Sequence, residues 1–261
     1  MNLSVTKKTT SGFGYFFIHS WPVLYEDNHL LALYKPSGLL IQGDQTKDVS
    51  LIDLARKWLK RKYNKPGNAY VGMVHRLDRP VAGVVLFCKT SKAAGRISDS
   101  FRKGRVEKEY VAVTEGRLEK PSGRLMHYIR RRGSSSLVSD RPVENGRIAA
   151  LTYRVIDVRK KATLVSVRLE TGRHHQIRAQ FAHIGHPLIG DLRYGALSAL
   201  DKKQIALFAI RLQVPHPVRK TPLTFTAPLP AGWPWPQAGG DEKNLFWNWA
   251  DVRDRVMNAF L

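Results

Sequence analysis

A nearly continuous apolar stretch at residues 81–88, VAGVVLFC, constrains this chain more than any other part of its sequence. It is far too short to cross a membrane, and its length is typical of a strand that is covered on both faces. A strand buried in this way is rigid, so the polar sequence at 75–79, HRLDR, should be held accurately at its start. We therefore expect 75–79 to be a loop anchored to a central strand.

Asp78 is the one carboxylate in this loop, and Arg76 and Arg79 lie on either side of it. Two nearby positive charges should lower the pKa of a carboxylate and keep it ionised. A carboxylate aimed from a rigid loop can act as a nucleophile or as a base. The alternative is a structural salt bridge at the start of the strand, and the loop sequence alone leaves both interpretations open.

The charge of the chain indicates its partner. Lys and Arg number 43 against 21 Asp and Glu, a formal net charge of +22. Such a surplus favours a polyanion, because neutralised phosphates release their counterions. The basic residues recur along the whole chain instead of on one amphipathic segment, so nucleic acid is favoured over a membrane surface. We expect no association with a membrane.

Cysteine and histidine usage bears on metals and on location. Cys88 is the only cysteine, which excludes internal disulfides and thiolate metal clusters. The spacing of His183 and His186 permits a metal site, but no nearby Glu, Asp or Cys set completes it, so we expect no metal. The N-terminal apolar patch is short and has no cleavage site after it, so a cytoplasmic protein is expected.

Periodicity predicts many strands and only a few helices. Apolar spacing and stop signals predict helices over 50–63, 91–104, 173–185 and from 241 onward. Hairpin-length connections between the remaining apolar runs predict a mixed α+β domain with a large sheet. Residues 120–149 are rich in Gly, Ser and Arg, and we expect a mobile basic loop or hairpin tip there, with Arg130, Arg131 and Arg132 ordered by RNA.

Five motifs in order resemble those of the RluA-type pseudouridine synthases, the RNA pseudouridylate synthase family. They are KPSG at 35–38, HRLD at 75–78 with the strand after it, EKEY at 107–110, GRHHQIR at 172–178 and HPLIGDLRYG at 186–195. The resemblance spans most of residues 22–230. It departs from the family pattern at Val81 and Ala82, where many members have Thr and Ser, which leaves the chemistry of Asp78 unaffected.

The resemblance implies a pseudouridine synthase fold, a large, mainly antiparallel mixed sheet with flanking helices and a central RNA-binding cleft. It implies isomerisation of uridine to pseudouridine in rRNA or tRNA without cofactor or metal. Asp78 matches the family's essential aspartate, and Arg178 the basic residue that pairs with it. Tyr110 matches the tyrosine that packs on the uracil, and Arg76 the arginine that inserts where the target base leaves the helix.

The residues themselves agree with this assignment. The isomerisation breaks the N1 glycosidic bond, turns the uracil and rejoins it through C5, which needs a carboxylate, a cation to orient it and an aromatic ring. The base must also leave its stack. We expect further RNA contacts from Arg79, Arg173 and His174, beside the arginines at 130–132.

The expected organisation is a basic arm at 1–20, a catalytic domain at 21–230, and a linker with an amphipathic helix at 231–261. We expect a monomer that acts on RNA without a small-molecule cofactor. The alternative function is an RNA-binding or ribosome-assembly protein that keeps the fold without turnover. A nucleic-acid hydrolase is disfavoured, because the chain lacks the acidic metal cluster that such enzymes usually need.

Overall fold

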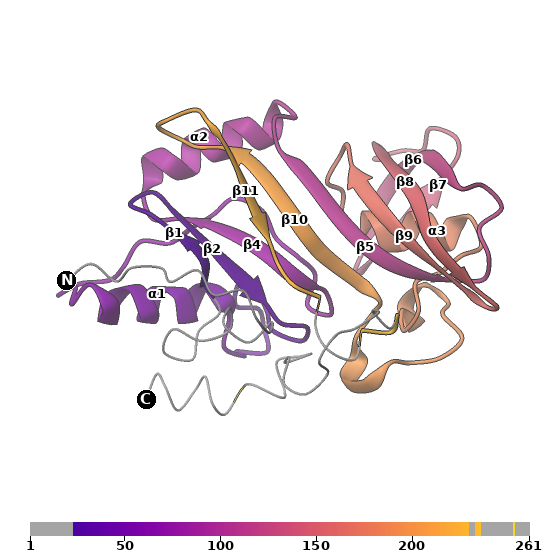
Figure 1. The fold of residues 1–261 in the computed structure, drawn as a ribbon, viewed down its shortest axis with the longest axis horizontal. Coiled ribbons are helices and arrows are strands. Elements are labelled where there is room, and N and C mark those ends of the chain that lie inside the picture. Colours follow the sequence, from indigo (N-terminus) through magenta and orange to yellow (C-terminus); the bar gives the residue numbers. More distant parts are fainter. Residues whose placement is uncertain (1–22, 230–232, 236–252, 254–261) are drawn as a thin grey trace.

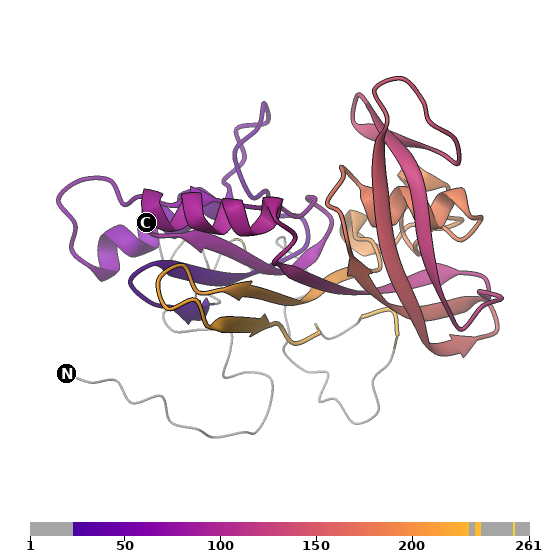
Figure 2. The ribbon, with the colours of Figure 1, turned by 90° about the horizontal axis from the view of Figure 1, so that it is seen from above.

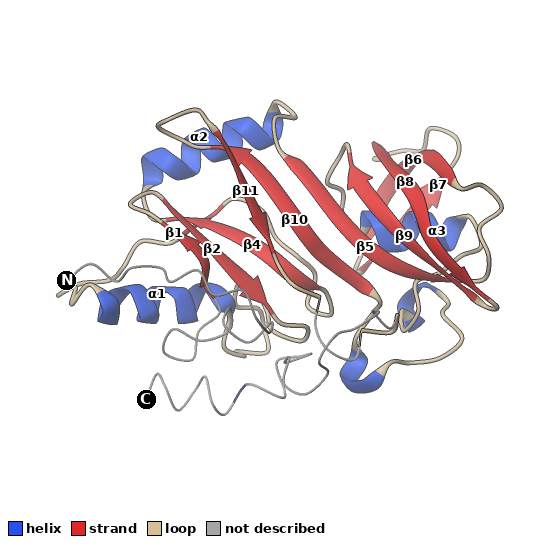
Figure 3. Ribbon diagram, viewed as in Figure 1, coloured by secondary structure: helices blue, strands red, loops and turns tan. Residues whose placement is uncertain are grey.

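The computed structural model describes residues 23–229, 233–235 and 253. The N-terminal arm expected at 1–20 and, apart from residue 253, the helix expected from 241 lie outside these residues, so both stay predictions. Within the described part, eleven strands form one mixed sheet accompanied by three α-helices. Figure 3 colours the strands red and the helices blue. This architecture confirms the α+β class with a large, mainly antiparallel sheet.

The elements follow the apolar pattern of the sequence closely. The helices are α1 (Leu51–Lys62), α2 (Ser91–Arg102) and α3 (Gln176–His183), with short 3₁₀ turns η1 (Leu192–Tyr194) and η2 (Asp201–Lys203). The strands are β1 (Val23–Glu26), β2 (Leu30–Lys35), β3 (Gly72–Met73), β4 (Ala82–Cys88), β5 (Glu107–Glu115), β6 (Ser122–Arg132), β7 (Ser135–Ser139), β8 (Arg147–Arg159), β9 (Ala162–Leu169), β10 (Leu207–Pro215) and β11 (Pro222–Thr226).

The sheet runs in the order β1-β2-β4-β10-β5-β9-β8-β6-β7, with β11 paired to β10 and β3 to β4 (Figure 1). Among the described strands, β4 and β10 form the one parallel pair, and the other pairs are antiparallel. In Figure 2 the strands β6–β9 turn out of the plane of the other half of the sheet. The strand β5 is therefore the last of the flatter half, and β9 the first of the turned half.

The strand β4 is buried at all seven positions, as its sequence predicts. Its alternate side chains feed two hydrophobic clusters, because successive residues of a strand point to opposite faces. Val85 and Phe87 belong to the cluster that includes the apolar side of α1 and of α3. Val84 and Leu86 belong to the cluster that includes part of α2. A strand held from both faces in this way is a rigid base for the loop before it.

The same alternation holds in β5, where Tyr110 lies in the first cluster and Val111 in the second.

Trp233, just beyond the boundary expected at 230, is buried in the second cluster with its ring 5.9 Å from that of Phe208. Within the described ranges, the helices are all too short or too polar to span a bilayer.

The basic segment around 130–132 differs from the expectation. It is the end of β6, paired residue by residue with β7 across a turn in which Gly133 has φ 55°. The hairpin was expected, but the mobile tip was wrong, because residues 130–132 are strand residues paired with 135–137 of β7, and the rest of β6 pairs with β8 up to Ile129. All three arginine side chains are exposed on this ordered hairpin.

The helix expected over 173–185 begins later, at Gln176. His175 precedes it with φ 52°, a left-handed conformation that a helix interior excludes. The side chain of Gln176 holds the preceding turn, because its Oε1 accepts from the backbone N–H of Arg173 at 2.9 Å and from the hydroxyl of Thr171 at 2.7 Å. Arg173 and His174 therefore lie in a turn at the start of α3.

Two glycine-to-alanine substitutions should have opposite effects on stability. Gly83 in β4 has φ 128°, and a Cβ there would lie 2.2 Å from the carbonyl oxygen of Ala209 on β10. Gly83→Ala should therefore lower the free energy of unfolding by about 3 kcal/mol or more. Gly95 lies in α2 with nothing within 4 Å of such an atom, so Gly95→Ala should raise it by about 0.5–1 kcal/mol.

Urea unfolding followed by circular dichroism measures both variants against the wild type. A Gly83→Ala protein with wild-type stability would contradict the close approach of β4 and β10.

Candidate active site

The loop that carries Asp78 joins β3 to β4 and is held by the KPSG segment at 35–38. The backbone N–H of Gly38 donates to the carbonyl oxygen of Arg79 at 2.7 Å, and the hydroxyl of Ser37 donates to that of Pro80 at 2.8 Å. The ammonium of Lys35 donates to the Arg79 oxygen as well, at 3.0 Å. Two motifs about forty residues apart in the sequence thus build one rigid loop.

Lys35 is completely buried at the end of β2. Burial lowers its pKa to about 7, with the charge of Asp78 opposing this shift and that of Arg79 adding to it. Its second hydrogen bond, at 3.0 Å, goes to the carbonyl oxygen of Pro36. The role of Lys35 in this arrangement is to fix the backbone next to Asp78.

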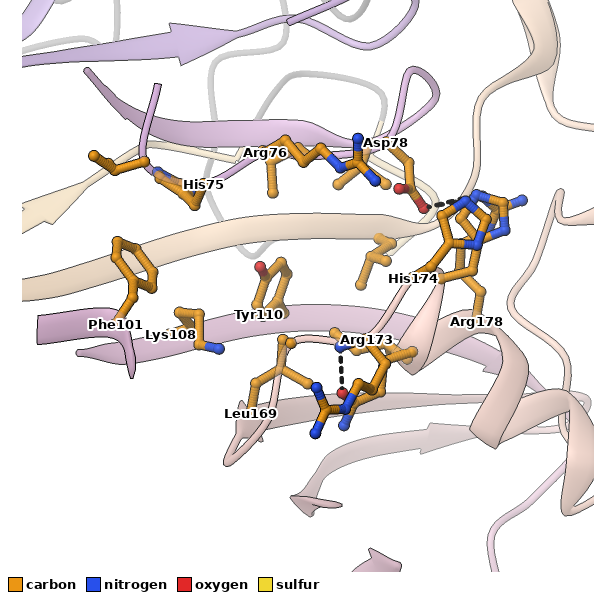
Figure 4. Close-up of a pocket in the computed structure, with 18 residues that line it drawn as sticks. His75, Arg76, Asp78, Phe101, Lys108, Tyr110, Leu169, Arg173, His174 and Arg178 are labelled. Atoms are coloured by element: carbon orange, nitrogen blue, oxygen red, sulfur yellow. Dashed lines mark hydrogen bonds and ion pairs between the residues drawn. The ribbon is translucent and has the colours of Figure 1, made fainter. Parts of the chain in front are cut away.

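A pocket of about 310 Å³ opens beside this loop (Figure 4). That volume is at the lower end of the range for small-molecule sites. Three residues proposed from the sequence as catalytic, Asp78, Tyr110 and Arg178, all line it. They come from the loop before β4, from β5 and from α3, so the fold brings together the three side chains that the motifs single out.

Arg178 is shared between two carboxylates. Its Nε and Nη2 donate to the two oxygens of Asp191 at 2.6 and 2.8 Å, and its Nη1 donates to Oδ2 of Asp78 at 3.0 Å. The side chains of Arg178 and Asp191 are 5% and 1% exposed, whereas that of Asp78 is 26% exposed. Asp191 is therefore the buried partner that fixes the guanidinium, and Asp78 is the partner that faces the pocket.

The electrostatics agree with this division. Burial by itself would lower the pKa of Arg178, but the hydrogen bonds and charge of Asp191, with those of Asp78, outweigh burial and raise it. The guanidinium therefore stays charged. Because two donors of the guanidinium bind Asp191, Arg178 would keep a charged partner if Asp78 were neutralised. Charge loss at Asp78 should cost less stability than charge loss at Asp191.

Tyr110 is 8% exposed and presents its ring to the pocket from β5. Burial, followed by the charge of Asp78, raises the pKa of its hydroxyl, so the phenol is neutral. Figure 4 shows Tyr110 and Lys108 on the strand that faces the loop of Arg76 and Asp78. The pocket thus has a neutral aromatic wall opposite its carboxylate.

Lys108 and His75 also line the pocket, although sequence reasoning proposed no role for them. The sequence could have indicated Lys108, because it lies two positions before Tyr110 in β5 and such residues point to the same face of a strand. Burial, with the charge of Arg173, lowers the pKa of Lys108. Burial and the charge of Lys108 lower that of His75 to about 4, and its Nε2 accepts from the backbone N–H of Leu86 at 2.9 Å.

The predicted RNA-binding residues fall into two groups. Arg76, Arg173 and His174 line the pocket. Arg79 lies outside it, with its Nη2 2.7 Å from Asp48 and its Nε donating to the carbonyl oxygen of Gly38. The three arginines at 130–132 lie on the β6–β7 hairpin and are not among the lining residues.

The histidines considered as metal ligands are separated by the fold. His186 is 2.9 Å from the carbonyl oxygen of Glu115, whereas His183 lies with His127 and Asp140, their ligand atoms within 4.8 Å of one another. Sequence proximity could not show this group, because its members come from α3, β6 and the segment after β7.

The donor set of this group fits a metal poorly. The side-chain amide of Gln180 lies 2.9 Å from Nδ1 of His127 and donates to the carbonyl oxygens of Leu125 and Ala149. The amide nitrogen has no lone pair that could accept from an Nδ1–H, so the neutral ring is better satisfied with its proton on Nε2. That nitrogen, 3.6 Å from Asp140, is the one a metal would need.

Comparisons with known proteins agree with the motifs. The family model for RNA pseudouridylate synthases matches residues 29–183. An uncharacterized RNA pseudouridine synthase of Bacillus subtilis is 32% identical over 212 residues, covering 80% of this chain and 68% of the relative. The ribosomal large subunit pseudouridine synthase D of Xanthomonas campestris is 33% identical over 233 residues, covering 80% and 66%. The chain thus spans about two thirds of the length of these relatives.

Solved structures share the fold. Human RNA pseudouridylate synthase domain containing 4 superposes with a TM-score of 0.67 at 21% identity, covering 80% of this chain and 88% of that one. Human RNA pseudouridylate synthase domain containing 1 gives 0.65 at 21% identity, covering 92% and 96%. These likenesses confirm the fold implied by the resemblance.

The burial of Asp191 leads to a stability prediction. Asp191→Asn should lower the free energy of unfolding by about 3–5 kcal/mol, because it removes a buried charge from a buried guanidinium. The matched control is Asp48→Asn, which neutralises a carboxylate whose pair with Arg79 is about half exposed. That change should cost less than about 1 kcal/mol. Urea unfolding measures both, and equal losses would show that Arg178 does not depend on Asp191.

Proposed function

This chain belongs to the RNA pseudouridylate synthase family, and from that premise we propose that it isomerises specific uridines to pseudouridine in structured RNA, rRNA or tRNA. The names of several relatives refer to the large ribosomal subunit, which favours rRNA. The observation that carries the proposal is Asp78, a partly exposed carboxylate oriented by a buried arginine at the wall of a pocket that is open to solvent.

Asp78 is the proposed catalytic group. The product requires that the C1′–N1 bond break, that a C1′–C5 bond form, and that a proton leave C5 while N1 gains one. Attack on the sugar, attack on the base and removal of a sugar proton are three routes to it, and each begins with a free carboxylate oxygen. Arg178 supports all three, because its guanidinium donates to one oxygen of the carboxylate and so orients it.

Tyr110 is the proposed support for the uracil while it is detached from the sugar. Its neutral ring gives the base a face to pack on, and its buried position excludes water from that side. Its hydroxyl, whose pKa is raised, is a donor and not a phenolate at neutral pH. Rotation of the uracil between N1 and C5 needs such an apolar surface, because a charged or strongly hydrogen-bonding wall would hold the base in one orientation.

RNA binding is proposed for two surfaces. Around the pocket, Arg76, Arg173 and His174 would contact the flipped nucleotide and its flanking phosphates, with Arg76 inserted where the base leaves its stack. Farther out, the ordered β6–β7 hairpin presents Arg130, Arg131 and Arg132 to the RNA backbone. An RNA contact by Arg79 stays a prediction.

Asp78→Asn tests the proposed chemistry. The amide keeps the size of the side chain but cannot act as a nucleophile or base, so pseudouridine formation should fall below detection. Binding of RNA should survive or strengthen, since a negative charge leaves a site that receives phosphates. The loss of stability should stay under about 2 kcal/mol, because Arg178 retains Asp191. Pseudouridine mapping, RNA binding and thermal melting on one preparation measure all three.

The outcomes separate the candidate functions. An active Asp78→Asn protein would end the assignment of this carboxylate. RNA from cells that lack the gene should miss pseudouridines that reappear when the wild-type gene is restored. If no site changes, the chain is an RNA-binding protein without turnover.

The hairpin leads to a separate prediction on affinity. Replacing Arg130, Arg131 and Arg132 together with Ala should weaken RNA binding and lower the slope of log affinity against log salt by up to about 3. The melting temperature should hardly change, because the side chains are exposed and the strand pairing uses the backbone.

The control removes the same charge elsewhere, by replacing Arg56, Lys57 and Lys60 on the exposed side of α1. A local hairpin contact requires the first variant to bind more weakly than the control. Equal weakening would mean that total charge, and not the hairpin, sets the affinity.

A further inference from the structure

His175 lies between the proposed catalytic carboxylate and the β6–β7 hairpin, and the chemistry above gives it no role. Its side chain is 7% exposed. Its Nε2 is 3.4 Å from Oδ2 of Asp78, and its Nδ1 is 2.9 Å from the hydroxyl oxygen of Tyr194. The left-handed backbone at His175 orients the ring between these two groups, so its position is specified by the turn before α3.

The hydrogen bonds at Tyr194 set the direction of this chain of contacts. The backbone N–H of Ser136, in β7, donates to the Tyr194 hydroxyl oxygen at 2.8 Å. That oxygen has already accepted one hydrogen bond, and its own proton is free to be donated to Nδ1 of His175. A ring that accepts at Nδ1 carries its proton at Nε2 when it is neutral.

The surroundings of the ring support the neutral form with this tautomer. Burial lowers the pKa of His175 to about 3; the charge of Asp78 opposes the shift, and Arg178, His174 and Arg193 add to it. With the opposite tautomer, a bare nitrogen lone pair would face an ionised carboxylate oxygen 3.4 Å away, which is repulsive. The tautomer protonated at Nε2 satisfies Tyr194 and Asp78 together.

We propose that His175 is a positioning residue for the reaction, which donates its Nε2–H to Oδ2 of Asp78 while Tyr194 holds its tautomer. This inference rests on the proposed function of Asp78. Arg178 donates to the same oxygen from α3. Arg178 and His175 both contact Oδ2 of Asp78. Among the described residues, no side chain makes a hydrogen bond or ion pair with Oδ1 of Asp78. Oδ1 is therefore the oxygen left to react with the substrate.

The distance of 3.4 Å is long for a hydrogen bond, which is expected before RNA is bound. Catalytic hydrogen bonds are often long in unliganded structures and shorten when the substrate closes the site. A carboxylate held at one oxygen by two donors from different elements loses its freedom to rotate, so the other oxygen meets the substrate in one orientation. His175 acts through Asp78 and needs no contact with the substrate.

Two amide variants of His175 separate this role from packing. The amide nitrogen of Gln can occupy the place of Nε2 and donate to Asp78, whereas that of Asn occupies the place of Nδ1 and cannot reach it. His175→Asn should slow single-turnover pseudouridine formation by about 10- to 100-fold, the range seen when an orienting partner is removed from a metal ligand. Half-saturating RNA and melting temperature should hardly change, because Asn tolerates the left-handed backbone. His175→Gln should recover most of the rate.

Tyr194→Phe removes the hydrogen bond between Tyr194 and His175. It removes the hydroxyl but keeps the ring, over which the Arg178 guanidinium lies at 5.1 Å. The rate should fall by about 3- to 10-fold, less than in His175→Asn, because the imidazole is still present. The control is Tyr63→Phe, which removes a hydroxyl bonded to Glu26 at 2.6 Å on an exposed surface and should leave the rate unchanged.

The nitrogen-15 NMR spectrum of labelled imidazoles reports the tautomer of His175 directly, whether or not the protein is active. In the free wild-type protein, His175 should show a protonated Nε2 and a bare Nδ1 at neutral pH. In Tyr194→Phe the share of the other tautomer should grow. A wild-type ring protonated at Nδ1, or at both nitrogens, would overturn the inference whatever the enzyme does.

The kinetic outcomes are equally decisive. A His175→Asn protein as fast as the wild type, or a His175→Gln protein as slow as His175→Asn at equal melting temperature, would also overturn the inference. Absence of synthase activity in the wild type would instead refute the proposed function, and the NMR result would still stand for or against the hydrogen-bond chain.

Discussion

The buried guanidinium of Arg178 is the interaction on which the site depends. A buried charge is stable only with good partners, and this one has two carboxylates from different parts of the chain, Asp191 and Asp78. Satisfying it joins α3 to the loop after Leu188 and to the loop before β4. The same requirement that stabilises this junction also orients the carboxylate that faces the pocket, so structure and proposed chemistry share one ion-pair network.

A second constraint makes that network useful, because both sides of the pocket are rigid. The strand β4 is buried on both faces and approaches β10 so closely that Gly83 has no room for a side chain. The KPSG segment then ties the loop of Asp78 down through Lys35 and Ser37. On the other side, Gln176 holds the turn before α3. Groups on such supports keep their geometry while RNA binds, which is the condition for a preorganised site.

Most elements follow from local patterns, and the differences have physical causes. The apolar run at 81–88 predicted a buried strand. The spacing within 50–63 and 91–104 predicted α1 and α2, with each end of each helix within two residues of its observed position. The late start of α3 came from the left-handed backbone at His175, which no periodicity reports. The ordered hairpin at 130–132 came from pairing with β7, since composition alone describes a segment without its neighbours. The group of His127, Asp140 and His183 likewise depends on how strands and helix meet.

The sequence by itself determined the family, the fold class, the basic charge that favours RNA, and the choice of Asp78, Tyr110 and Arg178 as candidate catalytic residues. These conclusions rest on composition, periodicity and ordered motifs, which are local properties. Only the tertiary structure decided that Asp191 is the main partner of Arg178, and that the ring of His175 lies between the Tyr194 hydroxyl and Asp78. Asp78 and Arg178 are 100 positions apart. Contacts over such separations depend on strand order, register and burial of the whole sheet, which no local pattern contains.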